Sequence, residues 1–144
     1  MIKTATNEET AFIMEHSTKS LNEGTGNRFD IPDEKAQKLL RKLLDKSGYF
    51  LIYKEDDQII GWILLGKNMD YFTDEEHGFI YELYVFEEYR GKGIGKQLMI
   101  AGIEEFKNSG LKSVRLNVFA SNPARKIYEQ LGFEDLQTVM EYYL

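Results

Sequence analysis

The sequence contains no cysteine, and its 144 residues include only two histidines and two prolines. Without cysteine there can be no disulfide bond, thiolate nucleophile or thiolate metal site, which agrees with a reducing compartment. His16 and His77 are far apart and show no metal-ligand spacing, so we expect no metal. No apolar run is long enough to cross a membrane, and the first residues lack the apolar segment of a signal peptide. We therefore expect one cytoplasmic domain over residues 1–144, without membrane contact.

Basic charge is also scarce. There are 18 Lys and Arg against 24 Asp and Glu, which gives a net charge of −6 and a pI near 5.0. Nucleic-acid binding relies on a basic surface, so this balance argues against a nucleic-acid partner. It suits a cationic substrate, but solubility alone also explains it.

Hydrophobic periodicity predicts helices and a hairpin in the first half of the chain. We expect a short strand over 2–6, a helix from an Asn7 cap to about residue 17, and a loop over 18–30. Apolar residues at helical spacing after Pro32 predict an amphipathic helix that Gly48 ends. Two β-rich runs over 49–66 then predict an antiparallel hairpin.

The second half predicts a crossover unit and a final helix and strand. After a polar loop over 68–78, the run 79–86 is apolar apart from Glu82 and reads as an interior strand. A helix over 94–108 and a strand over 113–119 follow, so the two strands should be parallel. The last helix should open at Ser121 or Asn122 and end at Gly132, before a final strand over 136–144.

A glycine-rich loop precedes the helix at residue 94. Three glycines alternate there with other residues and are flanked by cations: Arg90, Gly91, Lys92, Gly93, Gly95 and Lys96. Unpaired amides at a helix start attract anions, typically by ~0.3–1 kcal/mol, and glycines let phosphate oxygens approach the backbone. The pattern predicts a phosphate-bearing ligand, with a tight turn that needs positive φ as the alternative. The pattern does not fit a P-loop, because Gln97 follows Lys96 where that motif requires Ser or Thr. It does not fit the dinucleotide-binding fingerprint either, because Lys96 occupies the position of the third glycine.

This loop and the last helix together resemble a known family. The run Arg90 to Gly95 is followed by Asn122, Ala124, Arg125, Tyr128, Glu129, Gly132 and Phe133, in the manner of the GCN5-related N-acetyltransferase (GNAT) family. The resemblance covers about residues 49–136. It implies an α/β (α+β) fold with a mixed, mostly antiparallel sheet, a central pair of parallel strands that splay apart, and helices on both faces.

The resemblance also implies acetyl-CoA as co-substrate and a set of residues that bind it. In that family the glycine loop binds the pyrophosphate, and the preceding strand binds the pantetheine arm through its backbone. The matching residues here are Leu83, Tyr84, Val85, Arg90, Gly91, Lys92, Gly93, Ile94, Gly95, Lys96, Asn122 and Arg125. Asn122 lies six residues before Tyr128 where seven is more usual, so Ser121 is an alternative for its place.

The implied chemistry is direct acyl transfer from a thioester to an amine, for which two catalytic residues are candidates. A base helps because a primary amine is almost entirely protonated at pH 7. Glu82 is the lone carboxylate of its strand, and burial would raise its pKa; an edge-exposed or salt-bridged glutamate is the alternative. Tyr128 matches the tyrosine that protonates the departing thiolate, although its helical spacing also fits a core residue. Asn117 stands where some members carry a glutamate base, which shifts the role of base to Glu82.

The acceptor is less defined by the sequence. Residues 74–77 are acidic and end in His77, so this loop either attracts a cationic amine, with His77 as a shuttle base, or is simply solvated. The acceptor wall would lie within residues 12–44, including Arg28 and Phe29. We expect a small-molecule or peptide amine as acceptor, and either a monomer or a homodimer.

Three functions follow from these patterns. The first is an acetyl-CoA-dependent N-acetyltransferase that uses Glu82 and Tyr128. The second is a catalytically inactive acyl-CoA-binding module of the same fold, which needs only the glycine loop. The third is a protein that binds another phosphate-bearing ligand at the same helix start.

Overall fold

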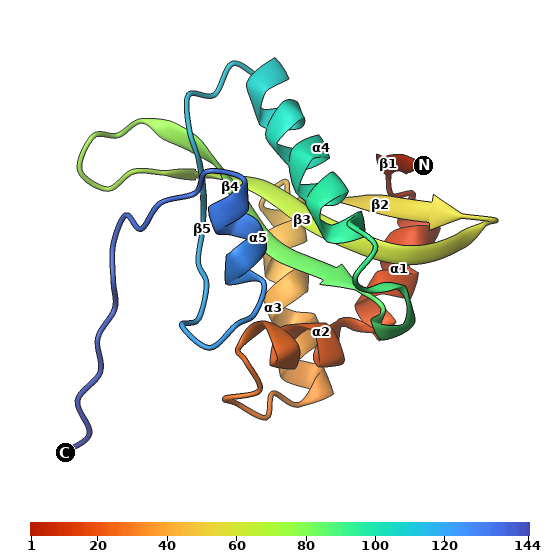
Figure 1. Cartoon of the computed structure of the whole chain (residues 1–144), viewed down its shortest axis with the longest axis horizontal. Helices are drawn as coiled ribbons and strands as arrows, with labels where there is room; N and C mark the ends of the chain where they lie inside the picture. Colours follow the sequence, from red (N-terminus) through yellow and green to blue (C-terminus); the bar gives the residue numbers. More distant parts are fainter.

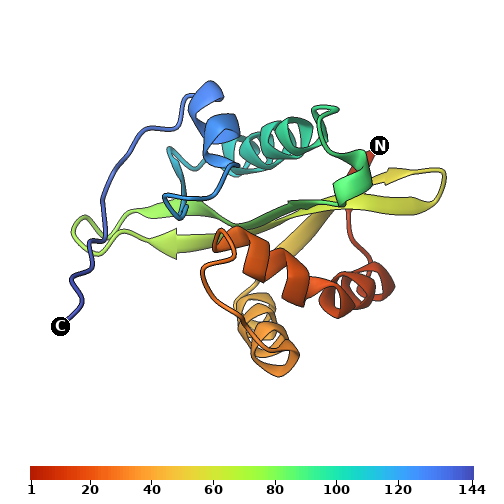
Figure 2. The ribbon, with the colours of Figure 1, turned by 60° about the horizontal axis from the view of Figure 1, so that its bottom comes forward.

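The computed structural model describes residues 1–144 as a five-stranded sheet between two layers of helices (Figures 1 and 2). The elements are β1 (Ile2–Thr4), α1 (Asn7–Glu15), α2 (Ser17–Gly24), α3 (Asp33–Asp45), β2 (Tyr49–Glu55), β3 (Gln58–Met69), β4 (Glu76–Val85), the 3₁₀ turn η1 (Glu87–Tyr89), α4 (Ile94–Asn108), β5 (Val114–Leu116) and α5 (Arg125–Gln130). Figure 2 shows α1, α2 and α3 on one face of the sheet and α4 and α5 on the other. None of the helices combines the length and the apolar character that a membrane span requires.

The sheet is mixed, as the sequence predicts. The strands follow chain order from β1 to β5, and every neighbouring pair is antiparallel except β4 and β5, which are parallel. The parallel register runs from Gly78 opposite Val114 to Ile80 opposite Leu116 and then stops. Beyond Ile80, β4 therefore continues to Val85 with no strand beside it on that edge.

Each face of the sheet carries its own apolar cluster, because side chains alternate along a strand. On β3, Ile63 and Leu65 pack with the α4 residues, whereas Trp62 and Leu64 pack with α1 and α3. These strand residues are completely buried. The two clusters hold the helical layers on opposite sides of β4, which passes between them.

A β-bulge interrupts this alternation on β4. The register with β3 shifts between Leu64, which faces Glu82, and Leu65, which faces Ile80, so Tyr81 has no opposite residue. A bulge places two consecutive residues toward one face. Tyr81 consequently packs with the α1–α3 cluster and Glu82 contacts Trp62 of the same cluster, while Leu83 packs with the α4 cluster.

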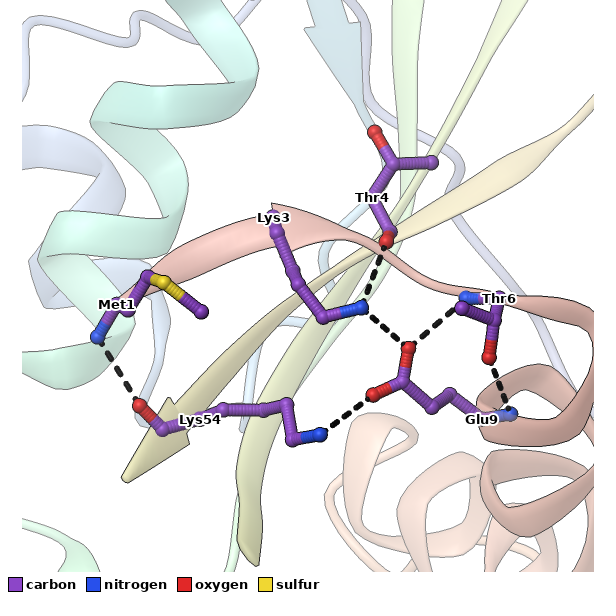
Figure 3. Close-up of polar contacts among 6 residues, drawn as sticks. All are labelled: Met1, Lys3, Thr4, Thr6, Glu9 and Lys54. Carbon is purple, nitrogen blue, oxygen red and sulfur yellow. Dashed lines mark hydrogen bonds and ion pairs between the residues drawn. The ribbon is translucent and has the colours of Figure 1, made fainter. Parts of the chain in front are cut away.

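Glu9 joins the start of α1 to the β1 edge of the sheet through two ion pairs (Figure 3). Its carboxylate lies 2.5 Å from Lys3 Nζ and 2.8 Å from Lys54 Nζ. It also accepts a hydrogen bond from the Thr6 amide, and the Thr6 hydroxyl accepts one from the Glu9 amide, which forms a capping box. The helix cap is thus Thr6, one residue before the predicted Asn7.

Two sequence predictions of local structure are wrong. The predicted loop over 18–30 contains α2, a helix rich in Ser, Thr, Asn and Gly, which have low helix propensity. Contacts with α3 and β4 hold this helix in place. The predicted strand over 136–144 is irregular and exposed, because its β-rich sequence finds no strand to pair with.

Two further elements are shorter than predicted. The predicted strand over 113–119 keeps only Val114–Leu116, the residues that face β4. The last helix spans Arg125–Gln130, and the predicted cap residue Asn122 instead accepts a hydrogen bond from the Ala124 amide in the turn before it. The length of β5 is thus set by its pairing with β4, which sequence periodicity does not record.

Candidate functional site

The glycine loop connects η1 to α4, and two of its glycines have left-handed backbone conformations. Gly91 has a φ of 79° and Gly93 a φ of 80°, values that strongly favour glycine. A Cβ atom at either position would meet nothing within 4 Å. The glycines are therefore required by the course of the backbone, and their outer surface is open.

The amides of this loop are unpaired, as the sequence predicts. The Arg90 N–H donates to the Glu87 carbonyl, and the next donor along the chain is the Gln97 N–H, which donates to the Gly93 carbonyl. The amides of residues 91–96 between them form no hydrogen bond within the protein. Because they stand at the N-terminal end of the α4 dipole, they form a cluster of donors suited to an anion.

The Arg90 side chain turns away from this donor cluster. Its Nε donates to the Val85 carbonyl at 2.7 Å, and its Nη2 lies 2.6 Å from the Glu23 carboxylate. The guanidinium also lies 5.2 Å from the ring centroid of Tyr84. In this structure Arg90 joins the loop to β4 and α2, while Lys92 lies near the Tyr89 ring.

The start of α4, the outer half of β4 and α5 converge beside the loop. A Cβ at Gly95 would lie 3.6 Å from Ile127, 3.8 Å from Leu83 and 3.9 Å from a Val85 methyl group. Tyr128, the neighbour of Ile127, is only 8% exposed, and burial raises the pKa of its hydroxyl to about 12. A neutral, proton-bearing hydroxyl thus stands on the α4 side of the unpaired part of β4.

Glu82 is buried on the opposite side of β4. The Trp62 Nε1 donates to its Oε1 at 2.5 Å, whereas Oε2 is buried without a hydrogen-bond partner. Burial raises the pKa of Glu82 to about 7, and this rise is partly offset by the Trp62 hydrogen bond and by the nearby Ser20 hydroxyl. Ser20 Oγ is itself buried and does not reach hydrogen-bond geometry with any group. Glu82 is therefore the buried carboxylate that the sequence predicts, and it forms no salt bridge.

Asn122 and Arg125 lie before and within α5, and their side chains contact other parts of the protein. The Asn122 Nδ2 donates to the Gly24 carbonyl at 3.0 Å, which ties this segment to the end of α2. Arg125 lies 2.5 Å from Asp135 and 3.1 Å from Glu129, two exposed carboxylates. Their roles in cofactor binding stay predictions. The ion pairs of Arg125 are exposed, so Arg125 can exchange its partners more freely than Asn122, whose side chain is hydrogen-bonded to the backbone.

His77 does not lie in a solvated loop, contrary to one of the two readings of its sequence. It belongs to β4 and is 4% exposed, with Nδ1 buried and unpartnered. Burial lowers its pKa, as does the Arg115 guanidinium, which is paired with Asp70. Asn117 is exposed on the segment after β5.

Arg28 and Phe29, which the resemblance assigns to the acceptor wall, both contact later parts of the chain. Arg28 donates to Glu141 and Tyr143 of the C-terminal segment, and Phe29 packs edge-on against Phe119 at 5.9 Å. Residues between α2 and α3 thus contact both the segment after β5 and the end of the chain. Sequence reasoning did not find Trp62 and Ser20, because each resembles an ordinary core or helix residue and contacts Glu82 only through the fold.

Comparison with known proteins gives a consistent result. The sequence model of the acetyltransferase (GNAT) family matches residues 12–133. The "Uncharacterized N-acetyltransferase YycN" of Bacillus subtilis is 36% identical over 86 residues, which are 59% of this chain and 54% of that protein. The "[Ribosomal protein bS18]-alanine N-acetyltransferase" of Haemophilus influenzae is 32% identical over 89 residues, 62% of this chain and 57% of that protein. This chain spans little more than half the length of these two relatives.

A solved structure shares the fold over nearly its whole length. It is described as a "predicted acetyltransferase with acetyl-CoA" from Clostridium acetobutylicum, and it superposes with a TM-score of 0.76 at 20% identity. The match covers 99% of this chain and 95% of that one. The order of strands and helices found here is therefore the order of a known fold.

Proposed function

The chain belongs to the acetyltransferase (GNAT) family, and from this membership we propose that it transfers an acetyl group from acetyl-CoA to a primary amine. The observation that carries the proposal is the row of unpaired amides over residues 91–96 at the start of α4. The acceptor is a small-molecule or peptide amine. The Haemophilus relative, which is named for a protein alanine, supports the peptide side of this class.

The residues of the glycine loop fit the diphosphate of the coenzyme. Two glycines with positive φ present adjacent amides outward, and a Cβ there would occupy the open space that phosphate oxygens need. Lys92 and Lys96 add positive charge. The edge of β4 beyond Ile80 has backbone groups with no strand beside them, which suits the amide-containing pantetheine arm. When bound, acetyl-CoA supplies an acetyl group on a thioester.

Glu82 fits the role of base. An amine with a pKa near 10.4 is neutral in only about 1 of 2,500 molecules at pH 7, so removal of its proton favours attack. The pKa of Glu82, raised to about 7 by burial, lets the carboxylate accept a proton near neutral pH. Its buried position implies that the proton travels through an intervening group or water.

Tyr128 fits the role of acid. Burial raises the pKa of its hydroxyl to about 12, so the hydroxyl keeps its proton at neutral pH and can donate it to a departing thiolate. Glu82 and Tyr128 lie on opposite faces of β4, where this strand has separated from β5. A base and an acid on opposite sides of the reacting carbonyl suit a direct transfer.

A second candidate is an acyl-CoA-binding module without catalysis. The depth of Glu82 favours it, because Oε2 is not accessible to solvent. Such a module would use the glycine loop alone.

One assay separates the two candidates. Purified protein, Glu82→Gln and Tyr128→Phe are each mixed with acetyl-CoA and a panel of primary amines and N-terminal peptides, and free thiol is measured. The transferase releases CoA with at least one amine, and each variant loses roughly 10²- to 10⁴-fold in rate while its Kd for acetyl-CoA, measured by calorimetry, stays nearly unchanged. Binding without thiol release from any amine supports the module. Absence of acetyl-CoA binding contradicts both candidates.

A further inference from the structure

We infer that Trp62 and Ser20 are positioning residues for Glu82, and that together they confine its proton to Oε2. Nothing in the family match assigns these residues a role. The effect on catalysis rests on the proposed function, whereas the effect on the carboxyl group itself does not.

Trp62 is a fixed donor to one oxygen of Glu82. It is completely buried on β3, and its ring packs against Tyr84 at 4.9 Å and Phe86 at 5.5 Å, so the indole has little freedom to rotate. Its Nε1–H donates to Glu82 Oε1. An indole N–H donates only and cannot accept a hydrogen bond. Oε1 therefore stays an acceptor in both protonation states, and the proton that Glu82 gains must reside on Oε2.

Ser20 is a second buried polar group near Glu82, on α2, which packs against β4. Its hydroxyl is close enough to lower the pKa of Glu82, yet Ser20 Oγ and Glu82 Oε2 are both buried atoms without a hydrogen-bond partner. Two buried polar atoms of this kind are costly to the fold unless they pair. A hydroxyl can donate to a carboxylate and can accept from a carboxylic acid. A small rotation of Ser20 thus serves Glu82 in either state.

The helix that carries Ser20 is held in place on both sides. Thr18 donates to Asp33 at 2.5 Å, which joins α2 to the start of α3, and Glu23 pairs with Arg90 beyond the end of β4. These contacts hold α2 in a fixed position against β4. The packing of α2 therefore determines where the Ser20 hydroxyl lies.

No charged side chain competes with this pair for control of Glu82. On α2, Lys19 and Glu23 are paired with Glu87 and Arg90. On β4, Tyr81 and Tyr84 have pKa values raised by burial and stay neutral. The apolar cluster around Trp62 receives Ile13 from α1 and Leu40 from α3. The pKa of Glu82 is therefore set by its burial and by two polar neighbours, Trp62 and Ser20.

The experiment titrates Glu82 directly in the protein without coenzyme. Glutamate labelled with ¹³C at the side-chain carboxyl gives an NMR signal for Glu82 that Glu82→Gln identifies by its loss. Trp62→Phe keeps an aromatic ring but loses the donor, so we expect the titration midpoint to rise by about 1 pH unit. Ser20→Ala should raise it as well, and Ser20→Thr, which keeps a hydroxyl, should restore it. The control is Ser17→Ala on the same helix, because the buried Ser17 hydroxyl bonds to the Met14 carbonyl instead.

The outcomes separate this inference from the proposed function. If the midpoint does not move in Ser20→Ala or in Trp62→Phe, or moves equally in Ser17→Ala, the inference is overturned; Ser20→Ala decides alone if Trp62→Phe does not fold. If the midpoint moves and the acid limb of the pH–rate profile moves with it, both stand. If the midpoint moves while the rate profile stays in place, the positioning role stands and Glu82 is not the base.

Discussion

Arg90 Nη2 lies 2.6 Å from Glu23 Oε2, so the segment that leads into α4 is joined to α2, which lies on the other face of the sheet. The same guanidinium holds the Val85 carbonyl at the end of β4. The Arg90–Glu23 ion pair thus anchors the loop proposed to bind the coenzyme to the helix that carries Ser20.

We predict that loss of this anchor weakens coenzyme binding indirectly. Glu23→Gln and Arg90→Ala should each raise the Kd for acetyl-CoA roughly 3- to 10-fold, equivalent to about 1 kcal/mol, and the double variant should lose little more than either single one. Calorimetric titration of the three variants measures this. If Glu23→Gln binds normally while Arg90→Ala loses affinity in a salt-dependent way, Arg90 contacts the phosphates itself.

Alanine at the loop glycines should separate backbone strain from binding. Gly91→Ala and Gly93→Ala each place a side chain in a left-handed conformation, at a cost of about 1 kcal/mol in unfolding free energy. Gly110→Ala is a matched control, because Gly110 also has a φ of 80° and open space around it but lies beyond the end of α4. We expect similar stability losses for all three variants, with acetyl-CoA affinity reduced at least tenfold only in the first two. Equal affinities would remove the phosphate role of the loop.

Glu9 should make the stability of the fold sensitive to acid. The Lys3 ammonium, then Lys54 and the Thr6 amide lower the pKa of Glu9 from 4.5 to about 2. Because the folded-state pKa lies below the unfolded one, the stabilisation is complete above pH 4.5 and is lost as the pH falls toward 2. Glu9→Gln should cost about 1 kcal/mol at pH 7, and its difference from the natural protein should shrink between pH 5 and 2 in urea unfolding. The exposed neighbour Glu8 provides the control Glu8→Gln, which should behave like the natural protein throughout.

Glu82 should have the opposite effect on stability. Its pKa rises from 4.5 to about 7 on folding, so the folded state is favoured by protonation, and stability falls as the pH rises between these values. Above pH 7 the ionised carboxylate costs the fold on the order of 3 kcal/mol, and Glu82→Gln relieves this cost. We expect the variant to melt at a higher temperature than the natural protein at pH 8 and to differ less at pH 5. A variant that is less stable at pH 8 would contradict the burial of an ionisable Glu82.

The sequence predicts the elements whose pattern is local. Helix α3, the hairpin of β2 and β3, and helix α4 lie where their periodicity places them, because each buries a face that its own residues define. The predicted loop over 68–78 is too long: β3 extends to Met69, and β4 begins at Glu76, three residues before the predicted start of this strand. The resemblance to the GNAT family, drawn from the glycine loop and the residues around Tyr128, is confirmed. Helix α2 was missed since its stability comes from neighbours on α3 and β4, and the strand predicted at the C-terminus has no partner.

The same contrast applies to the candidate site. The open amides over 91–96 follow from glycines next to a helix start, and the burial of Glu82 follows from an apolar strand around one carboxylate. The partners of Glu82 do not follow from any local pattern. Trp62 and Ser20 are 20 and 62 residues away from it along the chain, and only the packing of α2 and β3 against β4 brings the three together.

The extra residue in β4 decides which face of the sheet Glu82 occupies. With regular pleating, the side chains at positions 80 and 82 would share a face, so Glu82 would point among the aliphatic residues of α4, where neither the indole nor the hydroxyl could reach it. A one-residue slip of the end of β4 against β3, which would replace the bulge by regular pairing, would therefore move the carboxylate to the α4 face without any change of sequence. The spacing of one strand thus places the buried carboxylate on the face of the sheet opposite α4.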